Sequence, residues 1–193
     1  MIAATEPRVL VAGIGNVFFG DDGFGPAVVG RLAGERLPGE VDVVDYGIRG
    51  VHLAYTLLDG RHQSLILVDA LPMGEPPGTL AVIEVDGSGE VQGAMDAHAM
   101  SPAAVLSALA ALGGQLPRVL VVGCQPGALD CGMALSEAVA AVLDEAVRLV
   151  VEVAAAEAAG AGAAEVAGRA EAAGSGPETG RRAGDAEAVP ADA

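Results

Sequence analysis

The stretch from Val9 to Pro26 is the feature that most constrains the fold of this chain. It reads VLVAGIGNVFFGDDGFGP, an apolar run followed by glycine and asparagine and then by two acidic residues. The apolar run is typical of a strand buried on both faces, and the glycines after it let the chain turn sharply where the strand ends. Asp21 and Asp22 fall where a helix should begin. We expect one carboxylate to cap that helix and the other to point into the cleft above the sheet, where open α/β sheets bind their ligands.

The rest of the chain alternates between strand and helix patterns. Apolar runs predict strands at residues 8–13, 41–45, 64–69, 79–85 and 118–123. Helical periodicity predicts helices at about residues 22–37, around residues 52–58, and at about 102–112 and 136–154, with Ser101 and Ser136 as caps. This alternation predicts a doubly wound α/β fold, a three-layer sandwich around a mostly parallel five-stranded sheet.

Composition divides the 193 residues into a domain and a tail. Residues 8–154 hold nearly all the large apolar side chains and are predicted to form one domain, preceded by a flexible lead at residues 1–7. Residues 155–193 consist mostly of Ala, Gly, Glu and Arg. Such a segment buries too little apolar surface to offset the entropy lost on ordering, so we expect a disordered tail.

Charge and cysteine usage restrict the partners. The formal net charge is −16, and no basic stripe is present, which argues against nucleic acid. No uninterrupted apolar run approaches the ~20 residues of a membrane-spanning helix, so we expect no membrane partner. Cys124 and Cys131 form neither a CxxC pair nor a disulfide framework. We therefore expect a reducing, cytoplasmic environment.

Three aspartates are expected to meet at one edge of the sheet. Asp22, Asp45 and Asp69 come at or after the ends of the first three predicted strands, and His98 precedes the helix at 102–112. Two carboxylates and an imidazole from Asp22, Asp69 and His98 suit nickel, zinc or iron with open positions for water or substrate. Spacing alone leaves an alternative open, in which these aspartates cap helices and fix turns and the histidine is an ordinary surface residue.

Other features indicate less. Gly13 and Gly15 after the first strand favour a dinucleotide-binding turn, but the third glycine of that fingerprint would be residue 18, which is Phe18. Cys124 ends a predicted buried strand and is interpreted as an inert thiol. His62 is expected to be exposed to solvent.

The glycine and aspartate stretch resembles the N-terminal signature of the hydrogenase maturation endopeptidases. The resemblance covers roughly residues 8–150, and later motifs agree in their order. These motifs are Asp45-Tyr-Gly47 after the second strand, Val68-Asp69-Ala70 after the third, His98 before a Val-Leu-Ser-Ala-Leu helix, and Val122-Gly-Cys-Gln-Pro126 after the last strand.

The resemblance implies a phosphorylase/hydrolase-like fold and a cytoplasmic endopeptidase. Members of the family remove a C-terminal extension from the large-subunit precursor of a nickel–iron hydrogenase once nickel has been installed, so the precursor is the implied partner and the source of the nickel. The residues that the resemblance assigns to metal binding and catalysis are Asp22, Asp69 and His98, and those that it assigns to substrate contact are Asp45, Gly47 and Asn16.

The mechanism and two rival functions stay open at this point. Water attack can be assisted by the metal as a Lewis acid, or by a carboxylate as general base in the manner of an aspartic peptidase. A non-catalytic chaperone that senses nickel would use the same three ligands. A nucleotide-binding oxidoreductase would use the glycine turn instead.

Overall fold

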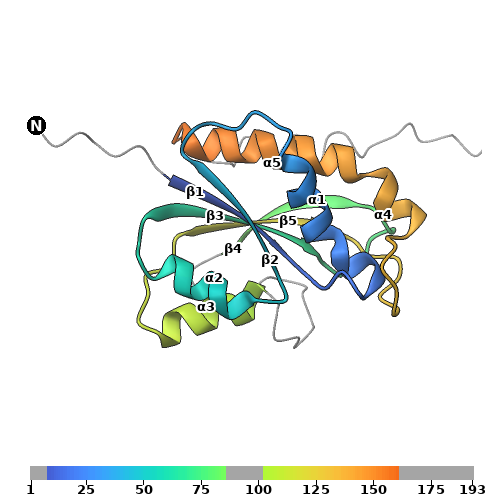
Figure 1. Cartoon of the computed structure of the whole chain (residues 1–193), viewed down its shortest axis with the longest axis horizontal. Helices are drawn as coiled ribbons and strands as arrows, with labels where there is room; N and C mark the ends of the chain where they lie inside the picture. The colour runs from blue at the N-terminus through green and yellow to red at the C-terminus, as the bar shows by residue number, and fades with distance from the viewer. Residues whose placement is uncertain (1–7, 86–101, 161–193) are drawn as a thin grey trace, which may run out of the picture.

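The computed structural model describes residues 8–85 and 102–160, and within these ranges the chain alternates between strands and helices (Figure 1). The strands are β1 (Arg8–Ile14), β2 (Val41–Gly47), β3 (His62–Ala70), β4 (Leu80–Val85) and β5 (Arg118–Cys124). The helices are the 3-10 helix η1 (Gly20–Gly23), α1 (Phe24–Leu32), α2 (Gly50–Leu57), α3 (Pro102–Ala111), α4 (Glu137–Ala141) and α5 (Leu143–Ala158).

The five strands form one sheet in the order β2-β1-β3-β5-β4. Strands β2, β1, β3 and β5 are parallel to their neighbours, and β4 pairs antiparallel with β5. The antiparallel strand follows from the connection before it, because residues 71–79 contain no helix and are too few for the crossover that parallel strands require. The predicted mostly parallel five-stranded sheet is therefore confirmed.

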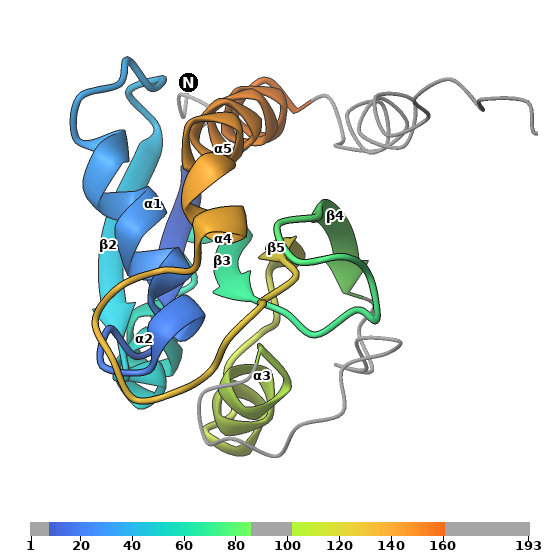
Figure 2. The same ribbon diagram turned by 90° about the vertical axis from the view of Figure 1, so that its right-hand side faces the viewer.

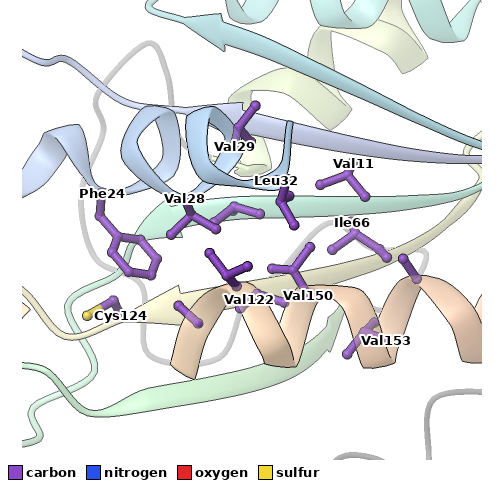
Figure 3. Packing of buried hydrophobic residues seen from close by; sticks show 14 of the residues in the cluster. Val11, Phe24, Val28, Val29, Leu32, Ile66, Val122, Cys124, Val150 and Val153 are labelled. Carbon is purple, nitrogen blue, oxygen red and sulfur yellow. The ribbon is translucent and has the colours of Figure 1, made fainter. Parts of the chain in front are cut away.

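Helices cover both faces of the sheet. Figures 1 and 2 show α1, α4 and α5 on one face and α2 and α3 on the other. Residues of β1, β3 and β5 alternate between the two layers. Val11, Ile66 and Val122 pack with α1 and α5 (Figure 3), and their neighbours along each strand pack with α2 and α3. The three central strands are buried on both faces, which is why they read as continuous apolar runs.

The first predicted helix is shorter than its pattern indicates. The sequence predicts one helix over residues 22–37. In the structure the 3-10 helix η1 comes first, and α1 then runs only from Phe24 to Leu32. Gly34 follows this end and donates a hydrogen bond from its N–H to the carbonyl of Arg31. Glycine is a poor helix former, and the remaining residues up to Pro38 are mostly exposed, so no buried face holds them in a helix.

The last predicted helix is two helices. The predicted segment 136–154 is interrupted at Val142, where the backbone leaves the helical region, with φ −99° and ψ 1°. Ser136 caps α4 as predicted, since its Oγ accepts a hydrogen bond from the N–H of Val139 at 3.4 Å. Helix α5 continues to Ala158, beyond the predicted domain boundary at residue 154, because buried Glu157 on its last turn accepts a hydrogen bond from Ser64.

Candidate active site

Glycines bring the start of α1 against the carboxyl ends of β1 and β3. A Cβ atom on Gly25 would lie 2.2 Å from the carbonyl oxygen of Val68 in β3 and 2.3 Å from that of Ile14 in β1. A Cβ on Gly15, which has a φ of +128°, would lie 1.9 Å from the carbonyl oxygen of Asp22. Only glycine permits backbones to approach this closely. The glycine-rich stretch therefore places η1, with its two aspartates, at the edge of the sheet.

Asp22 faces the loop that precedes it. Its Oδ2 atom accepts a hydrogen bond from the N–H of Asn16 at 2.7 Å. The side chain of Asn16 in turn accepts a hydrogen bond from the N–H of Phe18 at 3.0 Å. Neither η1 nor α1 has a side-chain cap, so the prediction that an aspartate caps this helix is wrong. The Asp22 carboxylate keeps capacity for further partners, since a carboxylate accepts about four hydrogen bonds.

Asp69 is a buried acid beside Asp22. It is the second-last residue of β3 and is only 7 % exposed. Burial is the main cause that raises the pKa of Asp69 well above its ordinary value, and the negative charge of Asp22 raises it further. A hydrogen bond from the backbone of Ala70 acts in the opposite direction and is the weakest of the three effects. The two acids at this edge thus have different environments, and burial favours the neutral form of Asp69.

Asp21 has a structural role that the sequence pattern did not reveal: its carboxylate binds the backbone of a distant loop. Its side chain is fully buried, and it accepts hydrogen bonds from the N–H groups of Gly127 and Ala128, both at 2.8 Å, and of Ser136 at 2.6 Å. Burial alone would raise the pKa of Asp21, but these hydrogen bonds outweigh it and lower the pKa. Asp21 therefore fastens the loop between β5 and α4 to the start of α1. The paired aspartates were a signal that two roles exist, but partners this far away in the chain gave no local pattern.

Asp45, at the end of β2, lies at the same edge of the sheet as Asp69 but on the opposite face. Val43 packs in the cluster beneath α1, and Asp45 shares its side of the strand because side chains alternate. Asp69 shares its side with Leu67, which packs against α2 and α3. Asp45 is exposed, and its Oδ1 accepts a hydrogen bond from the N–H of Gly47 at 2.8 Å. The structure thus brings Asp22 and Asp69 together, and it places Asp45 at the same edge but on the opposite face of the sheet from Asp69.

The predicted third ligand lies outside the described residues. His98 belongs to residues 86–101, which precede α3. Within residues 8–85 and 102–160, no three His, Cys, Asp or Glu side chains gather closely enough to hold a metal ion. The described part of the site offers two carboxyl groups, which are oxygen ligands, and a divalent cation would need further donors.

The glycine turn does not present its N–H groups to a ligand. The N–H of Gly15 donates to the carbonyl of Gly47 at 3.1 Å, and those of Asn16 and Phe18 donate within the loop. A dinucleotide turn needs free N–H groups and no nearby negative charge for the pyrophosphate, whereas here Asp22 follows the turn. The structure therefore disfavours the nucleotide-binding hypothesis.

Cys124 is a buried thiol with a raised pKa, which agrees with the prediction that it is inert. It ends β5 as a fully buried residue. Burial, with a smaller contribution from the charge of Asp21, raises its pKa to about 12. A thiol with such a pKa is almost entirely protonated near neutral pH and is a poor nucleophile.

The fold and the site together show which class of protein this is. It is an α/β protein with an acidic site at the carboxyl ends of its parallel strands. Residues 26–153 match the family model for the hydrogenase maturation protease. The chain therefore belongs to the hydrogenase maturation protease family, and its activity is that of a peptidase.

Sequence relatives cover most of the chain. A putative hydrogenase maturation protease from Methanocaldococcus jannaschii is 38% identical over 141 residues, which cover 71% of this chain and 90% of that protein. The hydrogenase expression/formation protein HupD from Rhodobacter capsulatus is 37% identical over 148 residues, which cover 75% of this chain and 70% of that protein.

A solved structure supports the same family assignment as the family model and the sequence relatives. The hydrogenase maturating endopeptidase HybD from E. coli superimposes with a TM-score of 0.65 at 28% identity, covering 79% of this chain and 94% of HybD. The predicted fold class and the family resemblance are thereby confirmed. In the described part of the chain, no helix is both long and apolar enough to cross a membrane.

Proposed function

We propose that this protein removes the C-terminal extension from the large-subunit precursor of a nickel–iron hydrogenase after nickel has been inserted. The observation that carries the proposal is the buried acid Asp69 beside the carboxylate of Asp22, at the edge where parallel α/β sheets bind their ligands. Membership of the hydrogenase maturation protease family supports the choice of reaction and of partner.

We treat nickel as part of the substrate. Under this proposal, Asp22, Asp69 and His98 contact the metal that the precursor already holds. Repulsion between the two carboxyl groups supports a cationic substrate, because a bound cation reduces the electrostatic cost of holding the two groups together. A precursor without nickel lacks this compensation and is bound less tightly. Asn16, Asp45 and Gly47 are proposed to contact the polypeptide around the metal.

A buried acid with a raised pKa beside a second carboxyl group suits peptide hydrolysis. In the carboxylate route, Asp22 accepts a proton from water as the water oxygen bonds to the scissile carbonyl carbon. Asp69 donates its proton to the carbonyl oxygen, which leaves two hydroxyl groups on the tetrahedral carbon. The proton held by Asp22 then passes to the leaving amine as the C–N bond breaks, and one hydroxyl proton returns to Asp69 as the carbonyl re-forms. In the alternative route, nickel held by the precursor polarises the carbonyl as a Lewis acid. The raised pKa of Asp69 supports the first route.

The proposal is tested by incubating the purified protein with a nickel-loaded and with a nickel-free precursor and weighing both products. We expect a loss of mass at the C-terminus of the nickel-loaded precursor only. Asp22→Ala should abolish this loss, while Glu145→Ala, which removes an exposed acid in the first turn of α5, should not. Processing by the Asp22→Ala protein at the wild-type rate would contradict the assignment of the site.

The same experiment separates cleavage from nickel sensing. A non-catalytic chaperone that recognises nickel through these ligands would bind the loaded precursor without any change in its mass. Binding without loss of mass, observed with the wild-type protein, would therefore favour the chaperone.

A further inference from the structure

Two loops beside the acidic site expose large apolar side chains. The loop after β1 exposes Val17, Phe18 and Phe19 by 39%, 61% and 43%, and the loop after β5 exposes Leu129 and Met133 by 47% and 73%. We call these five residues the apolar lip. Exposed apolar residues that occur singly are ordinary, but five on two adjoining loops mark an interaction surface.

The two loops of the lip form one body. Phe19 pairs with Gly132 in a short parallel bridge. The N–H of Gly132 donates to the carbonyl of Phe18 at 2.9 Å, and the N–H of Gly20 donates to the carbonyl of Gly132 at 2.7 Å. The buried carboxylate of Asp21 fastens the same loop from beneath. A surface that is ordered before binding loses little conformational entropy when a partner docks.

The lip is continuous with the acidic site. The N–H of Asp22 donates to the carbonyl of Phe19 at 3.1 Å. The Asp22 carboxylate accepts from Asn16, whose side chain holds the N–H of Phe18. The loop that carries Phe18 and Phe19 is therefore fixed beside Asp22.

The negative charge of the two loops restricts which polypeptide can bind to the apolar lip. Residues 15–23 and 125–136, which carry the lip, contain Asp21, Asp22 and Asp130 and no basic residue. An acidic polypeptide would be repelled here, while an apolar segment without acidic residues would be accepted. A peptidase must hold the chain on at least one side of the bond that it cuts, and the lip is an apolar surface next to Asp22.

We infer that the apolar lip is the docking surface for the segment of the hydrogenase precursor next to the cleaved bond, and that this segment presents apolar side chains to it. The inference rests on the proposed function, and it adds the means by which the polypeptide, as distinct from the metal, is recognised. Phe18 and Met133 are its most exposed members and provide most of the contact area.

The test is a double substitution, Phe18→Ser with Met133→Ser, compared with Leu112→Ser. Leu112 is 44% exposed and follows α3, at the opposite end of the sheet from the lip, so its substitution removes similar apolar surface elsewhere. Binding to immobilised nickel-loaded precursor and the kinetics of its processing are measured for all three proteins. Because the side chains are exposed, the midpoint of thermal unfolding should be unchanged, which controls for folding.

We expect the double variant to raise KM by about tenfold or more and to weaken binding equally, with kcat retained and with Leu112→Ser like wild type. Unchanged KM and binding in the double variant, with wild type active, would overturn the inference alone. A fall in kcat without a change in KM would also overturn it, since the lip would then act on the chemical step.

Two further outcomes separate the inference from the proposed function. Weakened binding by the double variant, together with no cleavage by wild type, would support the lip while contradicting the peptidase assignment. Sedimentation that shows a wild-type dimer, dissociated by the double substitution, would show that a second copy of this chain occupies the lip and would overturn the inference.

Discussion

The carboxyl group of Asp69 is buried at the end of β3 within the electrostatic influence of Asp22, and this relationship sets the protonation of the site. Burial is the larger of the two causes that raise the pKa of Asp69, so the acid would keep an elevated pKa without its neighbour. Asp22 keeps partial contact with solvent and a hydrogen bond from Asn16. The fold thus supplies, from two separate elements, one buried acid with a raised pKa and one acid that accepts a backbone hydrogen bond.

Asp69→Asn should stabilise the metal-free protein at neutral pH. In the unfolded chain Asp69 titrates near its ordinary value of 3.8, whereas in the folded protein its pKa is well above that value. Between these two pKa values the folded state binds more protons, so the free energy of unfolding falls as the pH rises. Asparagine has a similar shape and does not ionise, so the variant should lose this fall. Thermal unfolding followed from about pH 4 to about pH 9 measures the difference.

Asp22→Asn provides the matched comparison. It removes the neighbouring charge but not the burial, so it should lower the pKa of Asp69 only part of the way to its ordinary value. Either substitution should also reduce processing of the nickel-loaded precursor by about a hundredfold or more, the usual loss when an acid or base is removed. An Asp69→Asn protein with the same pH dependence of stability as wild type would contradict this account.

Asp21→Ala should destabilise the protein by about 3–5 kcal/mol, because it leaves the N–H groups of Gly127, Ala128 and Ser136 without their acceptor. The folded pKa of Asp21 is lowered, so its stabilising effect is present above the ordinary value of 3.8 and is lost as the pH falls through the folded pKa. Urea unfolding at neutral pH measures the loss. Asp130→Ala, in the same loop but exposed, should change the stability little, and equal losses in the two variants would refute the assigned role.

Local sequence patterns were sufficient for the sheet and for one acid pair. Five apolar runs predicted five strands, and the parallel order brought Asp22 and Asp69 to one edge, because each lies where a neighbouring strand ends. Alternation along β2 determines the face of the sheet on which Asp45 lies. Its position at the strand end was evident, but its face depends on the register of packing, which composition does not reveal.

Contacts between segments that are distant in the sequence could not be predicted from local sequence patterns. Asp21 binds backbone groups more than a hundred residues away, so nothing near it distinguishes a loop anchor from a helix cap. His62 was predicted to be exposed and is 7% exposed in the structure, because its Nε2 is 2.9 Å from an Oδ2 atom of Asp42 on the far side of β1. Burial of polar residues depends on tertiary partners, and a single sequence does not list them.

Two glycines of α1 should respond in opposite directions to alanine. At Gly25 a Cβ would lie 2.2 and 2.3 Å from two backbone oxygens that cannot move aside, so Gly25→Ala should lower stability by about 3 kcal/mol or more, or prevent folding. At Gly30, on the same helix, a Cβ would meet nothing within 4 Å, so Gly30→Ala should raise stability by about 0.5–1 kcal/mol. Urea unfolding of both variants measures these changes. A Gly25→Ala protein as stable as wild type would show that α1 does not pack so closely on the strand ends.

The two cysteines should differ sharply in reactivity. Cys124 is buried and its pKa is raised to about 12, whereas Cys131 lies exposed in the loop after β5. Iodoacetamide at mildly alkaline pH should therefore modify one thiol of the folded protein, at Cys131, and both thiols after denaturation, as peptide mass analysis can show. Cys131→Ser should process the nickel-loaded precursor at the wild-type rate, because no cysteine is assigned to the chemical step. Modification of Cys124 in the folded protein, or inactivity of Cys131→Ser with unchanged thermal unfolding, would instead indicate a thiol nucleophile and would remove the carboxyl pair from the centre of the mechanism.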